Sequence, residues 1–162
     1  MFPSDIEAQA VVVLAAARTK GLRIATAESC TGGLVAGALT EIAGSSDVFE
    51  RGFVTYSNDS KTAVLGVPAA MVAAQGAVSE VVARAMAQGA ARVSGTPVTV
   101  AVTGVAGPGG GSAAKPVGLV HFAVVGPDGE SHVERRFGDI GRSKIREDSV
   151  RQALRMLIEA IG

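Results

Sequence analysis

The sequence of 162 residues contains no tryptophan, one cysteine and two histidines. Because Cys30 has no second cysteine as a partner, an internal disulfide and a cysteine-based zinc cluster are both excluded. Two histidines leave few ligands for any other metal site, and we expect no metal. We also expect no cofactor. The near absence of cysteine fits a reducing compartment, and we therefore expect a cytoplasmic location.

The sequence also lacks a net charge and long apolar segments. The 15 basic side chains equal the 15 acidic ones, so the chain has no net field to attract a phosphate backbone, and no basic run alternates with aromatic residues. No basic segment followed by an apolar one opens the chain, and the run 11–17 is too short to span a bilayer. We expect neither nucleic acid nor a membrane among the partners.

The overall composition is typical of a compact domain. Hydrophobic residues make up 48% of the chain and charged residues 19%, which is typical of a globular protein. A chain of 162 residues is most simply one domain, 1–162, with one core. The mean hydropathy of +0.35 is high for a monomer of this size, so we expect a homo-oligomer.

The most informative segment is the turn Thr26–Leu34, which joins a predicted strand to a predicted helix. Such a turn directs the first backbone N–H groups of a helix beyond the edge of the sheet, where an anion or a developing oxyanion can bind. Ser29 lies in this turn, and Gly32 and Gly33 let the backbone approach a ligand closely. A simpler interpretation stays open, in which Ser29 or Thr31 only caps the helix.

The rest of the chain alternates between strand and helix patterns. A capping box at Ser4–Glu7 predicts the start of the first helix, and Pro127–Gly129 predicts a hairpin. The predicted helices are 4–19, 34–43, a short one from Lys61 to Gly66, 68–76, 79–94 and 142–161, and the predicted strands are 22–27, 53–56, 97–102, 117–125 and 131–137. This order favours the α/β class, as a three-layer α/β/α sandwich with a mixed, mostly parallel sheet.

Loops that follow parallel strands gather at one edge of a sheet, which would bring Ser29, Lys61 and Thr103 together. A serine hydroxyl needs a neighbouring base, and no histidine lies in these loops, so Lys61 is the candidate base. Partial burial would favour its neutral form, and Tyr56 could orient or relay the proton. The simpler alternatives are a solvated Lys61 and a Tyr56 packed at the end of a strand.

The loop 103–115 is rich in glycine, and successive glycine N–H groups can form a cavity that binds phosphate. It is not a Walker A loop, and no Gly-x-Gly-x-x-Gly motif opens a βαβ unit, so ATP hydrolysis and dinucleotide binding are not supported. Arg142, at the start of the last helix, could bind a phosphate through two hydrogen bonds. A flexible loop and a solvated arginine are the simpler interpretations.

Five blocks, in this order, resemble the CinA C-terminal domain family. They are Glu28–Gly33 (ESCTGG), Val54–Asn58 (VTYSN) followed by Lys61 and Leu65–Val67 (LGV), Gly76–Ser79 (GAVS), Ala101–Pro108 (AVTGVAGP) and Lys115–Gly118 (KPVG). The resemblance implies a nicotinamide-nucleotide amidase, a hydrolase that converts nicotinamide mononucleotide to nicotinic acid mononucleotide and ammonia in pyridine-nucleotide salvage. The substrate implied is thus a small-molecule nucleotide, and the reaction needs no metal.

The resemblance also implies roles for individual residues. Ser29 matches the nucleophile, Lys61 the general base and Tyr56 an assisting hydroxyl. Substrate binding and oxyanion stabilisation are expected of a larger set, namely Cys30, Thr31, Gly32, Gly33, Thr103, Gly104 and Arg142. The chain departs from the family before the last helix, because Gly138–Gly141 replaces the common Gly-Asp-Arg. Two alternatives remain at this stage, a nucleotide-binding module without turnover and an amidase for another carboxamide.

Overall fold

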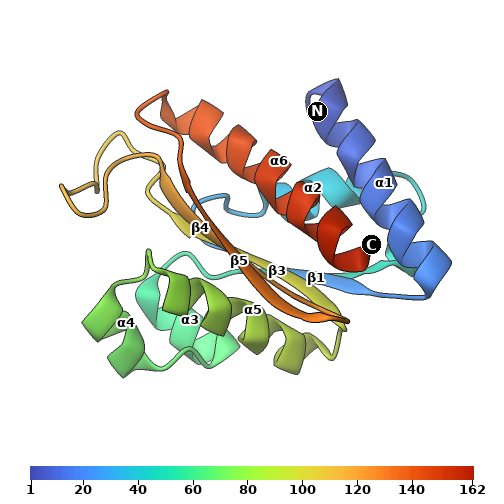
Figure 1. Ribbon diagram of the computed structural model, residues 1–162, viewed down its shortest axis with the longest axis horizontal. Coiled ribbons are helices and arrows are strands. Elements are labelled where there is room, and N and C mark those ends of the chain that lie inside the picture. Colours follow the sequence, from blue (N-terminus) through green and yellow to red (C-terminus); the bar gives the residue numbers. More distant parts are fainter.

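Five strands form one mixed sheet in the order β2-β1-β3-β4-β5 in the computed structural model, which describes all residues 1–162 (Figure 1). Strands β2, β1 and β3 are parallel neighbours, whereas β4 is antiparallel to both β3 and β5. Four of the five strands therefore point the same way, with β4 reversed. The strands are β1 (Ile24–Glu28), β2 (Phe49–Val54), β3 (Val98–Gly104), β4 (Leu119–Gly126) and β5 (Gly129–Arg136).

Helices cover both faces of this sheet, which confirms the predicted three-layer α/β/α sandwich (Figure 1). One layer contains α1 (Ser4–Lys20), α2 (Leu34–Thr40) and α6 (Arg142–Ile161), and the other contains α3 (Asn58–Leu65), α4 (Ala69–Gln75) and α5 (Glu80–Ser94). A short 3-10 turn, η1 (Ser45–Asp47), precedes β2. No helix has both the length and the apolar composition that crossing a bilayer would require.

The central strands carry different side chains on their two faces. Val98, Val100 and Val102 of β3 pack into a core of 25 residues beneath α1, α2 and α6, whereas Ala101 belongs to a core of 11 residues beneath α5. Since side chains alternate along a strand, large residues fill one face and small ones the other. Small residues let α5 lie close to the sheet, and Gly89 of α5 allows an equally close approach to the Leu65 carbonyl at the end of α3.

Most predicted elements are present, with shifted ends. The final helix spans 142–161 as expected, and Ser79 caps α5 by accepting a hydrogen bond from the Val82 N–H. The predicted strand 53–56 is wrong in extent, because β2 ends at Val54. The short helix expected from Lys61 begins earlier, at Asn58, because the Ser57 hydroxyl accepts the N–H of Ser60 and so caps α3.

The capping box at Ser4–Glu7 does not form. Ser4 is already helical, and no side chain caps α1. The amides of Ile6 and Glu7 donate instead to the carbonyl of Pro3, which stands before the helix. The Pro3 carbonyl therefore accepts the Glu7 N–H that a capping box would assign to the Ser4 hydroxyl. At the hairpin, only Gly129 has a positive φ, and Asp128 does not.

Candidate active site

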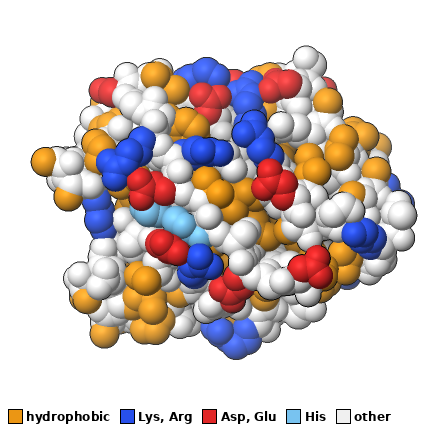
Figure 2. Space-filling model, viewed as in Figure 1, with side chains coloured by type: hydrophobic (Ala, Val, Ile, Leu, Met, Phe, Trp, Pro, Cys, Tyr) orange, Lys and Arg blue, Asp and Glu red, His pale blue; other side chains and the backbone are white.

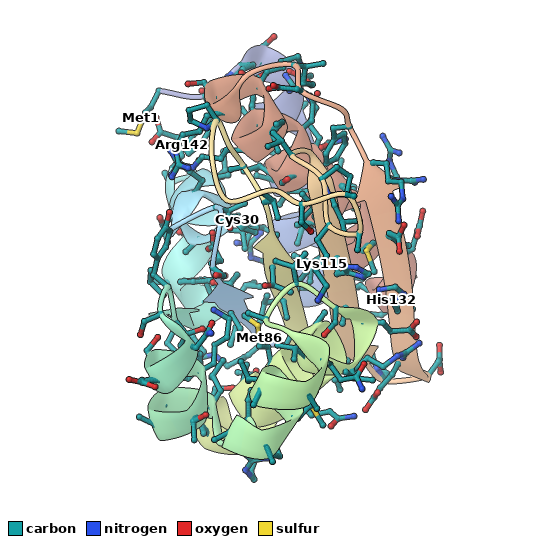
Figure 3. All side chains as sticks on the ribbon, turned by 90° about the vertical axis from the view of Figure 1, so that its left-hand side faces the viewer. Met1, Cys30, Met86, Lys115, His132 and Arg142 are labelled. Carbon is teal, nitrogen blue, oxygen red and sulfur yellow. The ribbon has the colours of Figure 1, made fainter.

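Three neighbouring strands deliver the candidate site to one edge of the sheet. Ser29 directly follows β1, Thr103 and Gly104 end β3, and Lys61 lies in α3, which follows β2. Because β2, β1 and β3 are adjacent and parallel, the segments that follow them meet at the same edge. Figure 3 looks onto this end of the molecule, where Cys30 and Arg142 lie.

Lys61 and Ser29 are in direct contact at this edge. The Nζ atom of Lys61 lies 3.0 Å from Oγ of Ser29, 2.8 Å from the carbonyl oxygen of Thr55 and 3.5 Å from that of Tyr56. A neutral amine has two N–H bonds and one lone pair. As an ammonium, Lys61 donates to Ser29 Oγ and to both carbonyls. Once it has lost one proton, donation to the two carbonyls leaves the lone pair free to accept the Ser29 O–H, which is the arrangement that a general base requires.

Burial shifts the pKa of the two ionisable side chains around Ser29. Lys61 is 1% exposed and forms no ion pair with a carboxylate, and burial lowers its pKa below the ordinary lysine value. Burial also raises the pKa of the Cys30 thiol to about 12, so this cysteine is a neutral thiol at physiological pH. Of the two adjacent side chains, Cys30 is thus held as a neutral thiol, and Ser29 is the one in contact with Lys61.

A cavity of about 270 Å³ opens beside this pair. Its wall includes Ser29, Cys30, Tyr56, Lys61, Thr103, Gly104 and Arg142, which are seven of the ten site residues predicted from the sequence. Thr31, Gly32 and Gly33 lie behind Cys30 and do not line the cavity. The side chain of Thr103 donates to the carbonyl of Ala77, 2.9 Å away, and so ties β3 to the segment before α5.

Arg142 connects two other residues of the cavity wall. Its guanidinium donates to the Gly107 carbonyl at 2.9 Å and to the Tyr56 hydroxyl at 3.0 Å. The Tyr56 side chain is exposed, and its hydroxyl contacts Arg142 rather than Lys61 or Ser29. Gly107, Gly109 and Gly110 of the glycine-rich loop also line the cavity, whereas Lys115 donates to the carbonyl of Gln75 outside it.

Two residues around the nucleophile were missed by the sequence reasoning. The buried carboxylate of Glu28 accepts the N–H groups of Gly33, Val35 and Ala36 at 2.8–3.0 Å, so Glu28 caps α2 in place of Ser29 or Thr31. Helix α2 has no acidic residue in its first turn, and this absence was the available signal.

Arg146 is the second missed residue. Its guanidinium donates to the carbonyls of Cys30 at 3.1 Å and Thr31 at 3.0 Å. Arg146 follows Arg142 by four residues, and this spacing places both arginines on one face of α6. The spacing was visible in the sequence, but the target of Arg146 was not.

The two histidines form a separate cluster on β4 and β5 (Figure 2). Nδ1 of His121 lies 2.9 Å from Nε2 of His132, and the carboxylates of Glu134 and Glu80 lie 3.8 and 3.7 Å from the two rings. Nowhere are three His, Cys, Asp or Glu side chains grouped so that they could hold a metal ion. The cluster does not line the cavity beside Ser29.

Known sequences place this architecture in a family. The sequence model of the CinA C-terminal domain matches residues 6–161. A CinA-like protein of Synechococcus sp. (strain RCC307) is 57% identical over 157 residues, and one of Anaeromyxobacter dehalogenans (strain 2CP-C) is 51% identical over 147 residues. These matches cover 96% and 90% of this chain but only 38% and 36% of the two relatives. The chain thus spans less than two fifths of these curated relatives.

Solved structures agree with the sequence comparison over the whole domain. The competence/damage inducible protein CihA from Agrobacterium tumefaciens is 55% identical, with a TM-score of 0.98, and the match covers 100% of this chain and 99% of that one. A CinA superfamily protein from Klebsiella pneumoniae 700603 is 33% identical, with a TM-score of 0.91 and coverage of 96% and 97%. Because the family model matches residues 6–161 and the relatives share both sequence and fold, the chain belongs to the CinA C-terminal domain family.

Proposed function

We propose that this chain is a nicotinamide-nucleotide amidase, a serine hydrolase that converts nicotinamide mononucleotide to nicotinic acid mononucleotide and ammonia in pyridine-nucleotide salvage. The observation that carries the proposal is the 3.0 Å contact between Lys61 Nζ and Ser29 Oγ beside a cavity. The family resemblance suggests the substrate, and the contact suggests how the chain would cleave its carboxamide.

In the first half of the reaction, Oγ of Ser29 attacks the carboxamide carbon while Nζ of Lys61 takes the hydroxyl proton. The carbonyl oxygen becomes an oxyanion in the tetrahedral intermediate. As the intermediate collapses, the C–N bond breaks and the Lys61 ammonium returns the proton to the leaving nitrogen, which departs as ammonia. An acyl-enzyme on Ser29 remains.

In the second half, a water molecule attacks the acyl carbon and Lys61 accepts its proton. The bond between the carbon and Oγ then breaks, Lys61 passes the proton to Ser29, and the product leaves as the carboxylic acid, which loses its remaining proton to solvent. Each oxyanion donor contributes on the order of 3 kcal/mol in comparable acyl-transfer enzymes. The amide of Cys30, the residue after the nucleophile, is the nearest candidate donor in the chain order.

The charges around the cavity support an anionic substrate. Of the 15 residues that line it, only Lys61 and Arg142 are basic and none is acidic. Lys61 is occupied by Ser29 and two backbone carbonyls. Arg142 is thus the cation available to a phosphate, alongside the glycine-rich loop that holds Gly107.

The direct test is ammonia release from nicotinamide mononucleotide by the purified protein, with and without a chelator. We expect turnover in both conditions, and we expect Ser29→Ala to abolish it. Turnover lost on chelation would contradict the metal-free mechanism. Calorimetric binding of the nucleotide without any product would favour a binding module, and turnover of another carboxamide in a substrate panel would redefine the substrate.

The phosphate contact has its own test. Arg142→Gln should raise KM for nicotinamide mononucleotide by about tenfold or more, since a charged hydrogen bond to phosphate contributes about 1.5–3 kcal/mol. The same change should leave KM for nicotinamide riboside, which lacks the phosphate, nearly unaltered. Lys115→Gln removes an equal charge outside the cavity and serves as the control. Equal effects on both substrates would show that Arg142 does not bind the phosphate.

A further inference from the structure

The nucleophile lies at the start of a single tight turn, Ser29–Gly33, which we call the nucleophile turn. The amide of Gly32 donates to the Ser29 carbonyl at 3.0 Å, and that of Leu34 donates to the Thr31 carbonyl at 3.2 Å. The backbone N–H groups of Cys30 and Thr31, which lie between Ser29 and Gly32 in the chain, donate to no acceptor in the protein. Two consecutive N–H groups directly after the nucleophilic serine thus have no acceptor, and that of Cys30 belongs to a residue that lines the cavity, where it can stabilise an oxyanion.

Helix α2 does not supply these donors. The Glu28 carboxylate occupies the amides of Gly33, Val35 and Ala36, which are the N–H groups that a helix N-terminus would otherwise offer. We expected the helix start itself to face the reaction. The free donors belong instead to the turn before it.

Arg146 holds the opposite side of the nucleophile turn. Its Nε donates to the Cys30 carbonyl at 3.1 Å and its Nη2 to the Thr31 carbonyl at 3.0 Å. No carboxylate lies within ion-pair distance of Arg146, whereas Arg151 of the same helix pairs with Asp5, Glu147 and Asp148. The donors of Arg146 thus go to the backbone of the turn.

A glycine provides the space for this contact. A Cβ atom on Gly32 would lie 3.3 Å from Nη2 of Arg146, and Gly32 has a φ of +59°. A side chain at this position would crowd the guanidinium and strain the backbone. The turn is thus shaped for the arginine behind it.

Because each peptide unit is planar, the bonds of Arg146 to two carbonyls also fix the orientation of the N–H groups on the other side of the turn. The carbonyl and the N–H of one peptide plane point in opposite directions, so an arginine on the Cys30 carbonyl fixes the direction of the Thr31 N–H. In the same way, its bond to the Thr31 carbonyl fixes the Gly32 N–H, which donates to the Ser29 carbonyl. That carbonyl shares its peptide plane with the Cys30 N–H, so the hold extends to the donor at the cavity wall. In a helical turn these N–H groups face back toward the residue that begins it, which is Ser29.

We propose that Arg146 is a positioning residue of the amidase, which holds the Cys30 and Thr31 carbonyls so that the amides of the nucleophile turn face the oxyanion on the substrate. Arg146 acts from behind the turn and does not line the cavity. The inference rests on the proposed function, because an oxyanion forms only if Ser29 attacks a carbonyl.

The test compares Arg146→Ala with Arg151→Ala, a matched change on the same helix. We expect Arg146→Ala to lower kcat by about tenfold to a hundredfold with little change in KM, since donors made mobile stabilise the transition state less. Arg151→Ala removes contacts to three carboxylates and should lower the thermal midpoint at normal kcat. Millimolar methylguanidine should restore part of the activity of Arg146→Ala only.

A second readout separates this inference from the substrate assignment. A fluorophosphonate probe phosphonylates an activated serine, and intact mass gives its rate at Ser29 with Ser29→Ala as the blank. We expect Arg146→Ala to slow labelling by a factor similar to its loss in kcat. Equal rates in the wild type and Arg146→Ala would overturn the role of Arg146. Labelling without mononucleotide turnover would overturn only the proposed substrate, and no labelling of the wild type would overturn both.

Discussion

Burial disfavours the charged form of both ionisable side chains beside Ser29, the thiol of Cys30 and the ammonium of Lys61. It raises the pKa of the Cys30 thiol to about 12 and lowers the pKa of the Lys61 ammonium, because each charged form loses its hydration. The thiol is therefore held protonated, and the amine is brought toward its neutral form. A neutral amine can act as a base, whereas a neutral thiol is a poor nucleophile, and for this reason our proposed mechanism uses Ser29 rather than Cys30.

The dependence of Ser29 on Lys61 gives the prediction at this scale. Lys61→Arg keeps a positive charge but cannot lose its proton near neutral pH, so it should lower kcat by about 10³-fold or more. Ser29→Ala should be equally damaging, and the double variant scarcely worse than either, because losses within one catalytic unit do not add. Steady-state kinetics of the three variants measures this.

The pH profile of the wild-type activity gives a second test of Lys61 as the base. Activity should rise with pH as Lys61 loses its proton, with an apparent pKa below the ordinary lysine value because of burial. Lys115→Arg, which alters an exposed lysine contact outside the cavity, should keep the profile unchanged. If Lys61→Arg retained near-normal kcat with an altered KM, Lys61 would be a binding cation, and Tyr56 would be the next candidate for the base.

At the scale of single elements, α2 depends on a residue outside it. The helix has only seven residues, and its first N–H groups are satisfied by the carboxylate of Glu28 at the end of β1. The side chain of Glu28 is 1% exposed and lies on the α2 side of the sheet. One buried charge thus joins β1 to α2 and keeps the nucleophile turn between them in a fixed shape.

Glu28→Gln tests this cap. The amide oxygen can still accept some of the three N–H bonds, but the loss of charge should lower the free energy of unfolding by about 1–3 kcal/mol. Urea denaturation monitored by circular dichroism measures the change. Glu41→Gln, at the exposed opposite end of α2, should cost less than about 0.5 kcal/mol. Similar losses for the two variants would show that Glu28 is not the cap.

At the scale of the whole molecule, the histidine pair links the antiparallel half of the sheet to α5. His121 of β4 and His132 of β5 face Glu80 and Arg84 of α5, with Glu134 on β5 and Lys115 of the preceding loop nearby. Burial lowers the pKa of both imidazoles, an effect that the charge on each neighbour modifies. Both rings are therefore neutral in the folded protein at pH 7.

Stability should consequently fall in mild acid. The unfolded chain binds protons on its histidines below about pH 6.5, whereas the folded chain resists them because its imidazole pKa values are lower. The free energy of unfolding should thus decrease from pH 7 to pH 5.5, where most carboxylates are still ionised. Urea midpoints at several pH values measure the slope, and His132→Gln should reduce it. An unchanged slope in that variant would contradict the assignment.

The sequence was enough to predict most of the residues that line the site, but not the contacts between them. Ser29, Lys61, Thr103 and Arg142 could be chosen because each lies after a strand or at a helix start, and the structure brings all of them to one cavity. Their contacts could not be predicted, because a hydrogen bond between residues 32 positions apart depends on how α3 packs against β1. Glu28 and Arg146 were missed for the same reason.

Local patterns determined the class of the fold and the order of its elements. The alternation of apolar residues, the Ser79 hydroxyl and the glycines that end helices act over a few residues, and their meaning can be found in the sequence alone. Register, neighbour order and burial depend on contacts between distant segments. Only the tertiary structure therefore decided that Lys61 is buried against Ser29, that Glu28 rather than Ser29 caps α2, and that Arg146 lies behind the nucleophile turn.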